Sequence, residues 1–212
     1  MRRIEYFFSV HSAYAYLGST KFTEIAKSAG CVIEYRPVDL RKVVDACNTV
    51  SFSDRSFAHK DYFFRRELER WSQERNVPIL STGPSFHSHE IATASSMVIA
   101  AQFQDIDVAA FSHALLANHW NKDADLADRS TLVKIAASVG LDGEELLKRG
   151  SSDAVTAQYD ANTQEAIDRS VFGSPTYFVD GDMFYGQDRL DMVERALKNP
   201  YAGDFKISMS PK

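Results

Sequence analysis

Sequence typical of β-strands is concentrated at the two ends of this chain of 212 residues. Near the N-terminus, residues 3–10 read Arg-Ile-Glu-Tyr-Phe-Phe-Ser-Val, and their alternation of apolar positions predicts a strand. A helical pattern begins at Ala13 and ends at Ala29-Gly30. Cys31 to Tyr35 then predicts a second strand. The first 38 residues therefore predict a β-α-β unit, whose two strands are parallel and joined by a right-handed crossover.

The C-terminal part of the chain predicts the order β-β-α. Thr176 to Val179 has the composition of a strand. Asp180-Gly181 is a dipeptide favoured in two-residue hairpin turns, and Asp182 to Tyr185 forms the answering strand. A helix is expected from about residue 187 to 197, after Gly186. A β-α-β unit and a β-β-α unit at opposite ends of a chain can share one sheet.

The middle of the chain shows no convincing strand. Helical stretches are predicted at 40–47, 58–75, 88–104, 107–119, 128–139, 142–149 and 152–170. The stretch from 88 to 104 is rich in Ala and Ser and is expected to pack closely against a neighbour. We therefore predict an α/β fold in which residues 1–39 and 171–212 form one domain and 40–170 form a large all-helical insertion.

Charge and cysteine content exclude several classes of function. The net charge is −5, which argues against a general affinity for nucleic acid or anionic membranes, since both need a positive surface. Cys31 and Cys47 are too few for a disulfide scaffold or a four-cysteine zinc site, and they form no CxxC motif. No stretch approaches the roughly 18 apolar residues of a membrane span. We expect a cytoplasmic protein with neither nucleic acid nor membrane as a partner.

Ser12 is the first candidate for a functional residue, because it lies where the first strand meets the first helix. A hydroxyl there is near the positive end of the helix dipole and near free backbone N–H groups, which together stabilise an anion. His11, Tyr14 and Tyr16 could line a pocket beside it. Serine is also a good helix N-cap, and the sequence alone leaves both interpretations open.

Two further candidates lie near the C-terminus. Ser174-Pro175 precedes a strand, where proline is tolerated in either a trans or a cis peptide bond. Gln187 and Asp188 follow Gly186 at a helix start. Asp188 could either cap that helix or accept an amino group of a ligand.

The six histidines do not predict a metal site. His87-Ser-His89 resembles half of one, but no acidic residue completes the ligand set. His113 and His119 are six residues apart on one predicted helix, so they do not share a face. The chain also lacks the glycine-rich nucleotide motifs, the GxSxG nucleophile motif and the HExxH zinc motif.

Taken together, the two ends resemble a known family. FFSVHSAYAYLG at the N-terminus and VFGSPTYFVDGDMFYGQDRLDMVERAL near the C-terminus resemble the 2-hydroxychromene-2-carboxylate isomerases and kappa-class glutathione transferases. These proteins share the thioredoxin-like fold of the DsbA superfamily. The middle is also similar, through a Cys47-Asn48 loop, His59-Lys60 and Val77-Pro78. Ala13 departs from the family, which usually has proline there, although alanine also starts a helix well.

The resemblance implies a glutathione site. Ser12 would contact the sulfur of glutathione and favour its thiolate. Ser174-Pro175 would be a cis-proline element that pairs with the peptide backbone of glutathione. Gln187 and Asp188 would hold the γ-glutamyl group, and Asn48 and Lys60 would contact the tripeptide. For Lys60, an exposed helix charge is the alternative.

The resemblance also implies a reaction. The thiolate adds to an electron-poor carbon of a small aromatic-derived ring acid, the ring opens, a bond rotates, and glutathione is regenerated. Aromatic residues would line the acid pocket, with Tyr14, Phe52, Phe86 and Tyr185 as candidates and burial in the core as the alternative. A glutathione transferase that consumes glutathione and a non-catalytic glutathione-binding protein remain alternatives. A homodimer is implied by the family, and the disulfide exchange of other superfamily members is not, because the Ser12 junction has no cysteine.

Overall fold

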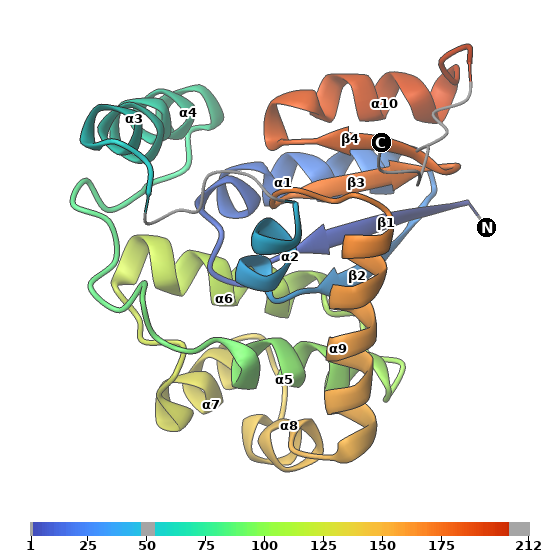
Figure 1. The fold of residues 1–212 in the computed structure, drawn as a ribbon. Helices are drawn as coiled ribbons and strands as arrows, with labels where there is room; N and C mark the ends of the chain where they lie inside the picture. The colour runs from blue at the N-terminus through green and yellow to red at the C-terminus, as the bar shows by residue number, and fades with distance from the viewer. Residues whose placement is uncertain (1, 48–53, 204–212) are drawn as a thin grey trace.

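The computed structural model describes residues 2–47 and 54–203 and contains a four-stranded sheet. The strand order is β2-β1-β3-β4, formed by β1 (Arg3–Phe8), β2 (Val32–Pro37), β3 (Thr176–Val179) and β4 (Asp182–Tyr185). β1 and β2 are parallel, whereas β3 is antiparallel to both β1 and β4. Both ends of the chain thus contribute to one sheet, which confirms the prediction from the sequence (Figure 1).

The hairpin between β3 and β4 has the turn that its sequence predicts. Asp180 and Gly181 both have positive φ angles, 51° and 88°. A type I′ turn requires positive φ at both central residues, and Asp-Gly accommodates this well. The short hairpin places Tyr185 beside the start of β3, so that β4 ends next to Ser174-Pro175.

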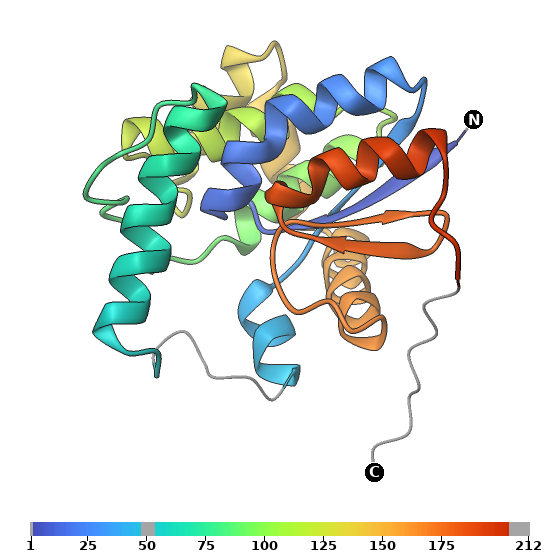
Figure 2. The ribbon, with the colours of Figure 1, turned by 90° about the horizontal axis from the view of Figure 1, so that it is seen from above.

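Two helices cover one face of the sheet. α1 (Ala13–Ser28) and α10 (Leu190–Lys198), which follows a 3₁₀ turn at Gln187–Arg189, run next to each other across it (Figure 2). Under them, Tyr6 stacks on Phe8 and Tyr177, with ring centroids 4.6 and 5.3 Å apart. This buried aromatic layer fixes α1, and therefore the residues at its N-terminus, relative to β1 and β3.

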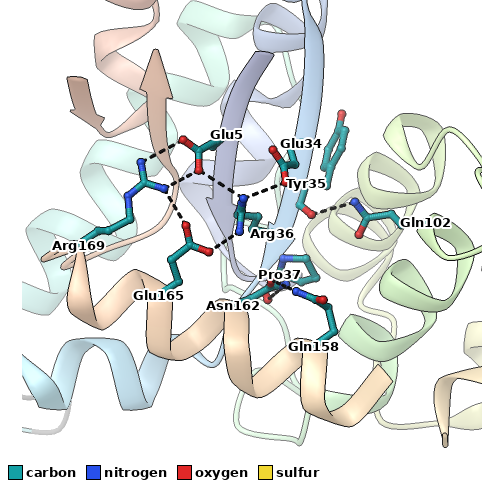
Figure 3. A network of polar contacts seen from close by, with 10 residues as sticks. All are labelled: Glu5, Glu34, Tyr35, Arg36, Pro37, Gln102, Gln158, Asn162, Glu165 and Arg169. Carbon is teal, nitrogen blue, oxygen red and sulfur yellow. Dashed lines mark hydrogen bonds and ion pairs between the residues drawn. The ribbon is translucent and has the colours of Figure 1, made fainter. Parts of the chain in front are cut away.

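The opposite face is covered by α2 (Leu40–Ala46) and α9 (Asp153–Asp168). Beneath α9 lies a network of ion pairs, in which Arg36 and Arg169 both contact Glu5 and Glu165 (Figure 3). Arg169 also lies over the ring of Phe178, with its guanidinium carbon 3.7 Å from the ring centroid. Charged and aromatic groups together hold α9 against the face of the sheet that α1 does not occupy.

Helices α5 (Ala92–Gln102), α6 (Ala109–Lys122), α7 (Arg129–Ser138) and α8 (Gly143–Gly150) form the helical region. The small residues of α5 allow the close packing predicted for them, since a Cβ on Gly150 of α8 would lie 3.4 Å from the Ser96 backbone. One core cluster runs without interruption from α1 and the sheet into these helices. The division into a domain of 1–39 plus 171–212 and an insertion of 40–170 stays a prediction.

The predicted helix at 58–75 is interrupted by a π-helical turn. α3 (Phe57–Asp61), the π turn (Tyr62–Arg66) and α4 (Glu67–Arg75) follow one another directly. The Tyr14 hydroxyl donates a hydrogen bond of 2.7 Å to the Phe63 carbonyl oxygen, which ties this wider turn to α1. π turns frequently occur at functional sites, and this one lies at the end of α1 that carries Ser12.

The helix predicted from residue 88 begins only at Ala92. The preceding residues form a turn instead, closed by the His89 N–H donating to the Phe86 carbonyl oxygen. The segment 76–91, which connects α4 to α5, therefore has no helix of its own among its residues. Among the described residues, none of the helices combines the length and apolar composition needed to span a membrane.

Candidate functional site

Ser12 is the N-cap of α1, in extended conformation. Its Oγ accepts a hydrogen bond from the Ala15 N–H at 3.3 Å and donates one to the Ser174 carbonyl oxygen at 3.1 Å. The two alternatives left open by the sequence are therefore compatible, because one hydroxyl both caps the helix and reaches across to another element. Ser12 is 8% exposed, so its hydroxyl lies at the edge of the interior.

Ser174 is held opposite Ser12 by hydrogen bonds at both of its ends. Its Oγ accepts from the Ser9 N–H at 3.0 Å, and its carbonyl oxygen accepts from Ser12. The Ser174-Pro175 peptide bond is cis, as the resemblance implied. Gly173, directly before it, packs against the ring of Tyr185 so closely that a Cβ would lie 2.7 Å from Cζ of that ring.

These residues open onto a cavity of about 660 Å³. This volume lies in the range of pockets for small molecules, roughly 300–1,000 Å³. One side, which we call the Ser12 wall, consists of Ser12, Ala13, Tyr14, Gly173, Ser174 and Tyr185. A second group of lining residues, which we call the histidine wall, consists of His11, Arg41, Ser85, His87, Ser88 and Trp120. Phe63 and Phe64 of the π turn add aromatic surface to the lining.

Of the histidine wall, sequence reasoning predicted only His11 as a lining residue and missed the rest. His11, His87 and His119 come from three different elements and lie together, with ring centroids 4.6 Å apart for His11–His87 and 5.4 Å for His87–His119. His87 and His89, which resemble half a metal site in the sequence, have different partners, since His87 contacts His119 and His89 contacts Asp125. Within the described ranges, no three His, Cys, Asp or Glu side chains are placed to hold one metal ion.

The titrating groups of the two walls are shifted in directions that keep them neutral. Burial lowers the pKa of His87 to about 4, and His119 and the positive charge of Arg41 act in the same direction. Burial also lowers the pKa of His11 and His119. On the Ser12 wall, burial raises the pKa of the Tyr14 hydroxyl. The cavity therefore presents neutral imidazoles and phenols at neutral pH.

The remaining residues predicted to bind a ligand are spread around the cavity rather than in it. Asp188 is exposed and pairs with Arg189, with its oxygen 2.7 Å from Nη1. Its negative charge contributes, after burial, to the raised pKa of Tyr14, which indicates that it lies near the mouth of the cavity. Lys60 lies in α3 and is half-buried. Asn48 lies outside the described residues, as does Phe52 among the predicted aromatic residues.

Gln187 differs most from its predicted place. Its side chain is 1% exposed, and its Oε1 accepts a hydrogen bond of 2.9 Å from Nε of Arg75. A close approach of α1 at Gly18 covers it, because a Cβ there would lie 2.6 Å from the Gln187 Cβ. Its ligand contact stays a prediction, and the structure gives the side chain a packing role. Phe86, another predicted wall residue, contacts His89 rather than the cavity.

Comparison with known proteins places the fold. A family model described as the DSBA-like thioredoxin domain matches residues 3–198. A probable DsbA oxidoreductase from Streptomyces coelicolor superposes with a TM-score of 0.75 at 14% identity, over 99% of this chain and 94% of that one. The chain belongs to the DSBA-like thioredoxin family. The predicted thioredoxin-like fold is confirmed.

Nearer relatives carry a more specific name. The 2-hydroxychromene-2-carboxylate isomerase of Sphingobium xenophagum is 33% identical over 196 residues, which covers 92% of this chain and 98% of the relative. The Pseudomonas putida isomerase of the same name is 28% identical over 92% of this chain and 93% of its own. A solved structure of a 2-hydroxychromene-2-carboxylate isomerase superposes with a TM-score of 0.79 at 27% identity, covering 92% of this chain and 94% of that one. Within the larger family, the chain belongs with these isomerases.

Proposed function

We propose that this chain isomerises a 2-hydroxychromene-2-carboxylate to its ring-opened form, trans-o-hydroxybenzylidenepyruvate, with glutathione as a cofactor. The observation that carries the proposal is the Ser12 hydroxyl at the N-terminus of α1, facing Ser174 at the edge of a cavity of about 660 Å³. The isomerase relatives, similar over nearly their whole length, support the reaction.

The residues of the Ser12 wall fit glutathione by the chemistry of their donors. A hydroxyl and the first N–H groups of a helix favour a thiolate over a thiol, because each is a donor at the positive end of the helix dipole. Bound glutathione would supply a thiolate nucleophile at this place. Ser174 would bind its peptide backbone, and Asp188, Lys60 and Asn48 are the predicted contacts for its charged ends.

Ser12 has to change one hydrogen bond to act in this way. Its hydroxyl has a single proton, which the Ser174 carbonyl oxygen accepts in the structure described here. Donation to a sulfur therefore requires rotation about the Cα–Cβ bond, and the Ser174 carbonyl oxygen would then accept from the ligand instead. Since the Ala15 N–H still needs an acceptor, the hydroxyl oxygen can keep its capping role.

The test compares Ser12→Ala with Ser152→Ala. Ser152 caps α9 as Ser12 caps α1, with its Oγ accepting from the Val155 N–H, but it lies outside the cavity lining. Each substitution is expected to cost about 1 kcal/mol of stability through the lost cap. Only Ser12→Ala should abolish the ultraviolet thiolate signal of bound glutathione and lower kcat by about 10²–10³-fold, the usual effect of losing one charge-stabilising donor.

The outcomes separate the alternatives. Isomerisation with glutathione recovered unchanged supports the proposal, whereas stoichiometric loss of glutathione to a conjugate supports a transferase. Glutathione binding with no thiolate signal and no turnover supports a non-catalytic protein. Isomerisation at the same rate without glutathione would contradict the cofactor assignment.

A further inference from the structure

A chain of hydrogen bonds fixes the tautomers of His87, in the histidine wall, and of His119, which contacts it. Nδ1 of His119 lies 2.9 Å from the Ala124 carbonyl oxygen, and Nε2 of the same ring lies 3.1 Å from Nδ1 of His87. A carbonyl oxygen only accepts, so Nδ1 of His119 carries the proton. Nε2 of a neutral His119 then has only a lone pair, and Nδ1 of His87 must be the donor to it.

The consequence appears at the other nitrogen of His87. When Nδ1 carries the proton of a neutral imidazole, Nε2 has a lone pair and acts as an acceptor. Nδ1 and Nε2 point to different edges of the ring, and Nδ1 faces His119, which is 2% exposed. Nε2 therefore faces away from the interior. No residue of 2–47 or 54–203 hydrogen-bonds to it, and His87 is an exposed residue of the cavity lining.

The segment that carries His87 is held in place from three sides. The Leu80 N–H donates to the Trp120 carbonyl oxygen at 2.8 Å, and both the N–H and the Oγ of Ser85 donate to Asp123. Arg41 donates to the Ser88 carbonyl oxygen at 3.1 Å. The His87 ring also packs against Trp120, with centroids 5.2 Å apart. The acceptor is thus preorganised, which is what a catalytic or binding group needs.

The kind of ligand group that Nε2 of His87 would bind follows from its lone pair and from the charge beside it. A neutral imidazole lone pair binds a hydrogen-bond donor, and Arg41 in the same wall disfavours a cation there. The acid of the proposed function carries such a donor, the hydroxyl on the carbon whose ring bond opens. We propose that His87 is a catalytic residue, which takes the proton of this hydroxyl and returns it to the ring oxygen, with His119 as its positioning residue.

The proposed step is balanced and needs no further reactant. Nε2 of His87 takes the hydroxyl proton, the O–H electron pair forms the new carbonyl, and the bond from that carbon to the ring oxygen breaks with its pair on oxygen. The resulting phenolate takes the proton back from Nε2. Throughout the step, the Nδ1–H of His87 continues to donate to His119. This inference rests on the proposed function for its substrate, although the fixed lone pair does not depend on it.

The first experiment measures the tautomers without any ligand. Long-range ¹H–¹⁵N spectra of the histidine rings at pH 7.5 should show His87 and His119 both protonated at Nδ1 and unprotonated at Nε2. His119→Gln, whose amide can both donate to Ala124 and accept from His87, should retain the His87 tautomer, and His119→Leu should lose it. A wild-type His87 protonated at Nε2 would overturn the inference before any variant is made.

The second experiment separates accepting a hydrogen bond from carrying a proton. The probes are trans-2-hydroxycinnamate and trans-cinnamate, which differ by one hydroxyl, and binding is followed by the tryptophan fluorescence of a Trp71→Phe background, in which Trp120 of the cavity lining is the remaining tryptophan. The wild-type chain should prefer the hydroxylated acid roughly tenfold, the effect of one well-formed hydrogen bond. His87→Gln, still an acceptor, should keep most of this preference, and His87→Phe should lose it.

Turnover supplies the third readout. His87→Gln should lower kcat for isomerisation by about tenfold, with KM and the glutathione thiolate signal unchanged; this is less than the usual factor of about 10² or more for a general acid–base group, because a pKa of about 4 makes His87 a weak base. His113→Gln is the matched control, because His113 lies on the same helix as His119 but hydrogen-bonds Ser19 outside this cavity. A kcat of His87→Gln within about threefold of the wild type would overturn the proton-carrier role.

Failure of the proposed function would look different. A wild-type chain that shows no isomerisation contradicts the proposed function and with it the proton transfer. The tautomer and the hydroxyl preference use neither glutathione nor turnover, so they still decide whether His87 is an acceptor. Equal affinity for the two cinnamates in the wild type overturns that part as well.

Discussion

The two walls of the cavity differ in how the chain builds them. The Ser12 wall comes from the junctions of strands with their neighbouring segments, at the start of α1 and before β3, and both junctions belong to the sheet. The histidine wall combines His11, from the turn before α1, with residues of α2, the connection 76–91 and the end of α6, and long-range side-chain contacts hold it together. The sheet and its junctions thus supply one wall, and contacts between segments far apart in the sequence supply most of the other.

We infer from this difference that the Ser12 wall binds the cofactor and the histidine wall binds the substrate. If it is correct, the two walls should respond to separate ligands. Ser12→Ala should remove the glutathione thiolate signal and leave the roughly tenfold preference for trans-2-hydroxycinnamate intact. His87→Phe should do the opposite. Titration of each variant with both ligands measures this crossed pattern. Loss of both signals in either variant would show that the cavity works as one site.

The backbone features of the Ser12 wall could be predicted from the sequence because their signals are local. The alternation of residues 3–10, the serine before a helical pattern and the proline before a strand each predict a backbone feature without knowledge of the fold. Pairing of β1 with β3 then brings Ser12 and Ser174 together. The sheet topology was enough to place both residues.

The histidine wall could not be found in this way. His87 and His119 are 32 positions apart, and only the packing of 76–91 on the end of α6 makes them neighbours. The spacing of His87 two residues before His89 does not indicate His119 as its partner. The sequence did not indicate that Arg41 lines the cavity, because a lone arginine in a short helix is usually a solvated charge. The burial of Gln187 could not be predicted for a related reason, since it depends on the glycine that brings α1 close.

Acid should destabilise the histidine wall before the Ser12 wall. The pKa of His87 is lowered to about 4, and those of His11 and His119 are also lowered from the ordinary value near 6.5. Between those values and 6.5 the unfolded chain binds more protons, so the stability present above about pH 6.5 is lost as the pH falls toward 4. We expect a falling Tm over this range, at roughly 2–4 °C for each kcal/mol lost.

His87→Gln removes one of these groups and should flatten the Tm curve between pH 6.5 and 4.5. Asp123, which also holds the segment of His87, does not contribute to this loss of stability between pH 6.5 and 4.5. Hydrogen bonds from Ser85 lower the pKa of its carboxyl group, so Asp123 stays charged over this range. His113→Gln serves as a comparison, since the pKa of His113 is also lowered by burial. Identical curves for wild type and His87→Gln would contradict a network of neutral imidazoles.

Arg41 should contribute to both the charge and the specificity of its wall. Its positive charge lowers the pKa of His11 and His87. Arg41→Gln should therefore raise the His87 pKa in an NMR titration and weaken binding of both cinnamates by about threefold to fivefold, as expected for an exposed charge pair with a carboxylate. Lys42→Gln, its exposed neighbour outside the cavity lining, is the control. An unchanged His87 pKa would place Arg41 outside the electrostatic range of the wall.

Gly173→Ala tests the Ser12 wall with a single methyl group. A Cβ at Gly173 would lie 2.7 Å from Cζ of Tyr185, so the ring must turn away from its contact with Phe172, whose centroid is 4.7 Å away. Because Tyr185 is 38% exposed and can move outward, the cost should stay near 1 kcal/mol, at the low end for overpacking. Gly150→Ala is the matched control, since its Cβ would meet only ordinary contacts at 3.4–3.5 Å.

Glutathione affinity should fall by about threefold in Gly173→Ala alone, because Tyr185 and Ser174 line the same wall. The preference between the two cinnamates should not change, and a change there would mean that the walls share a boundary at Tyr185.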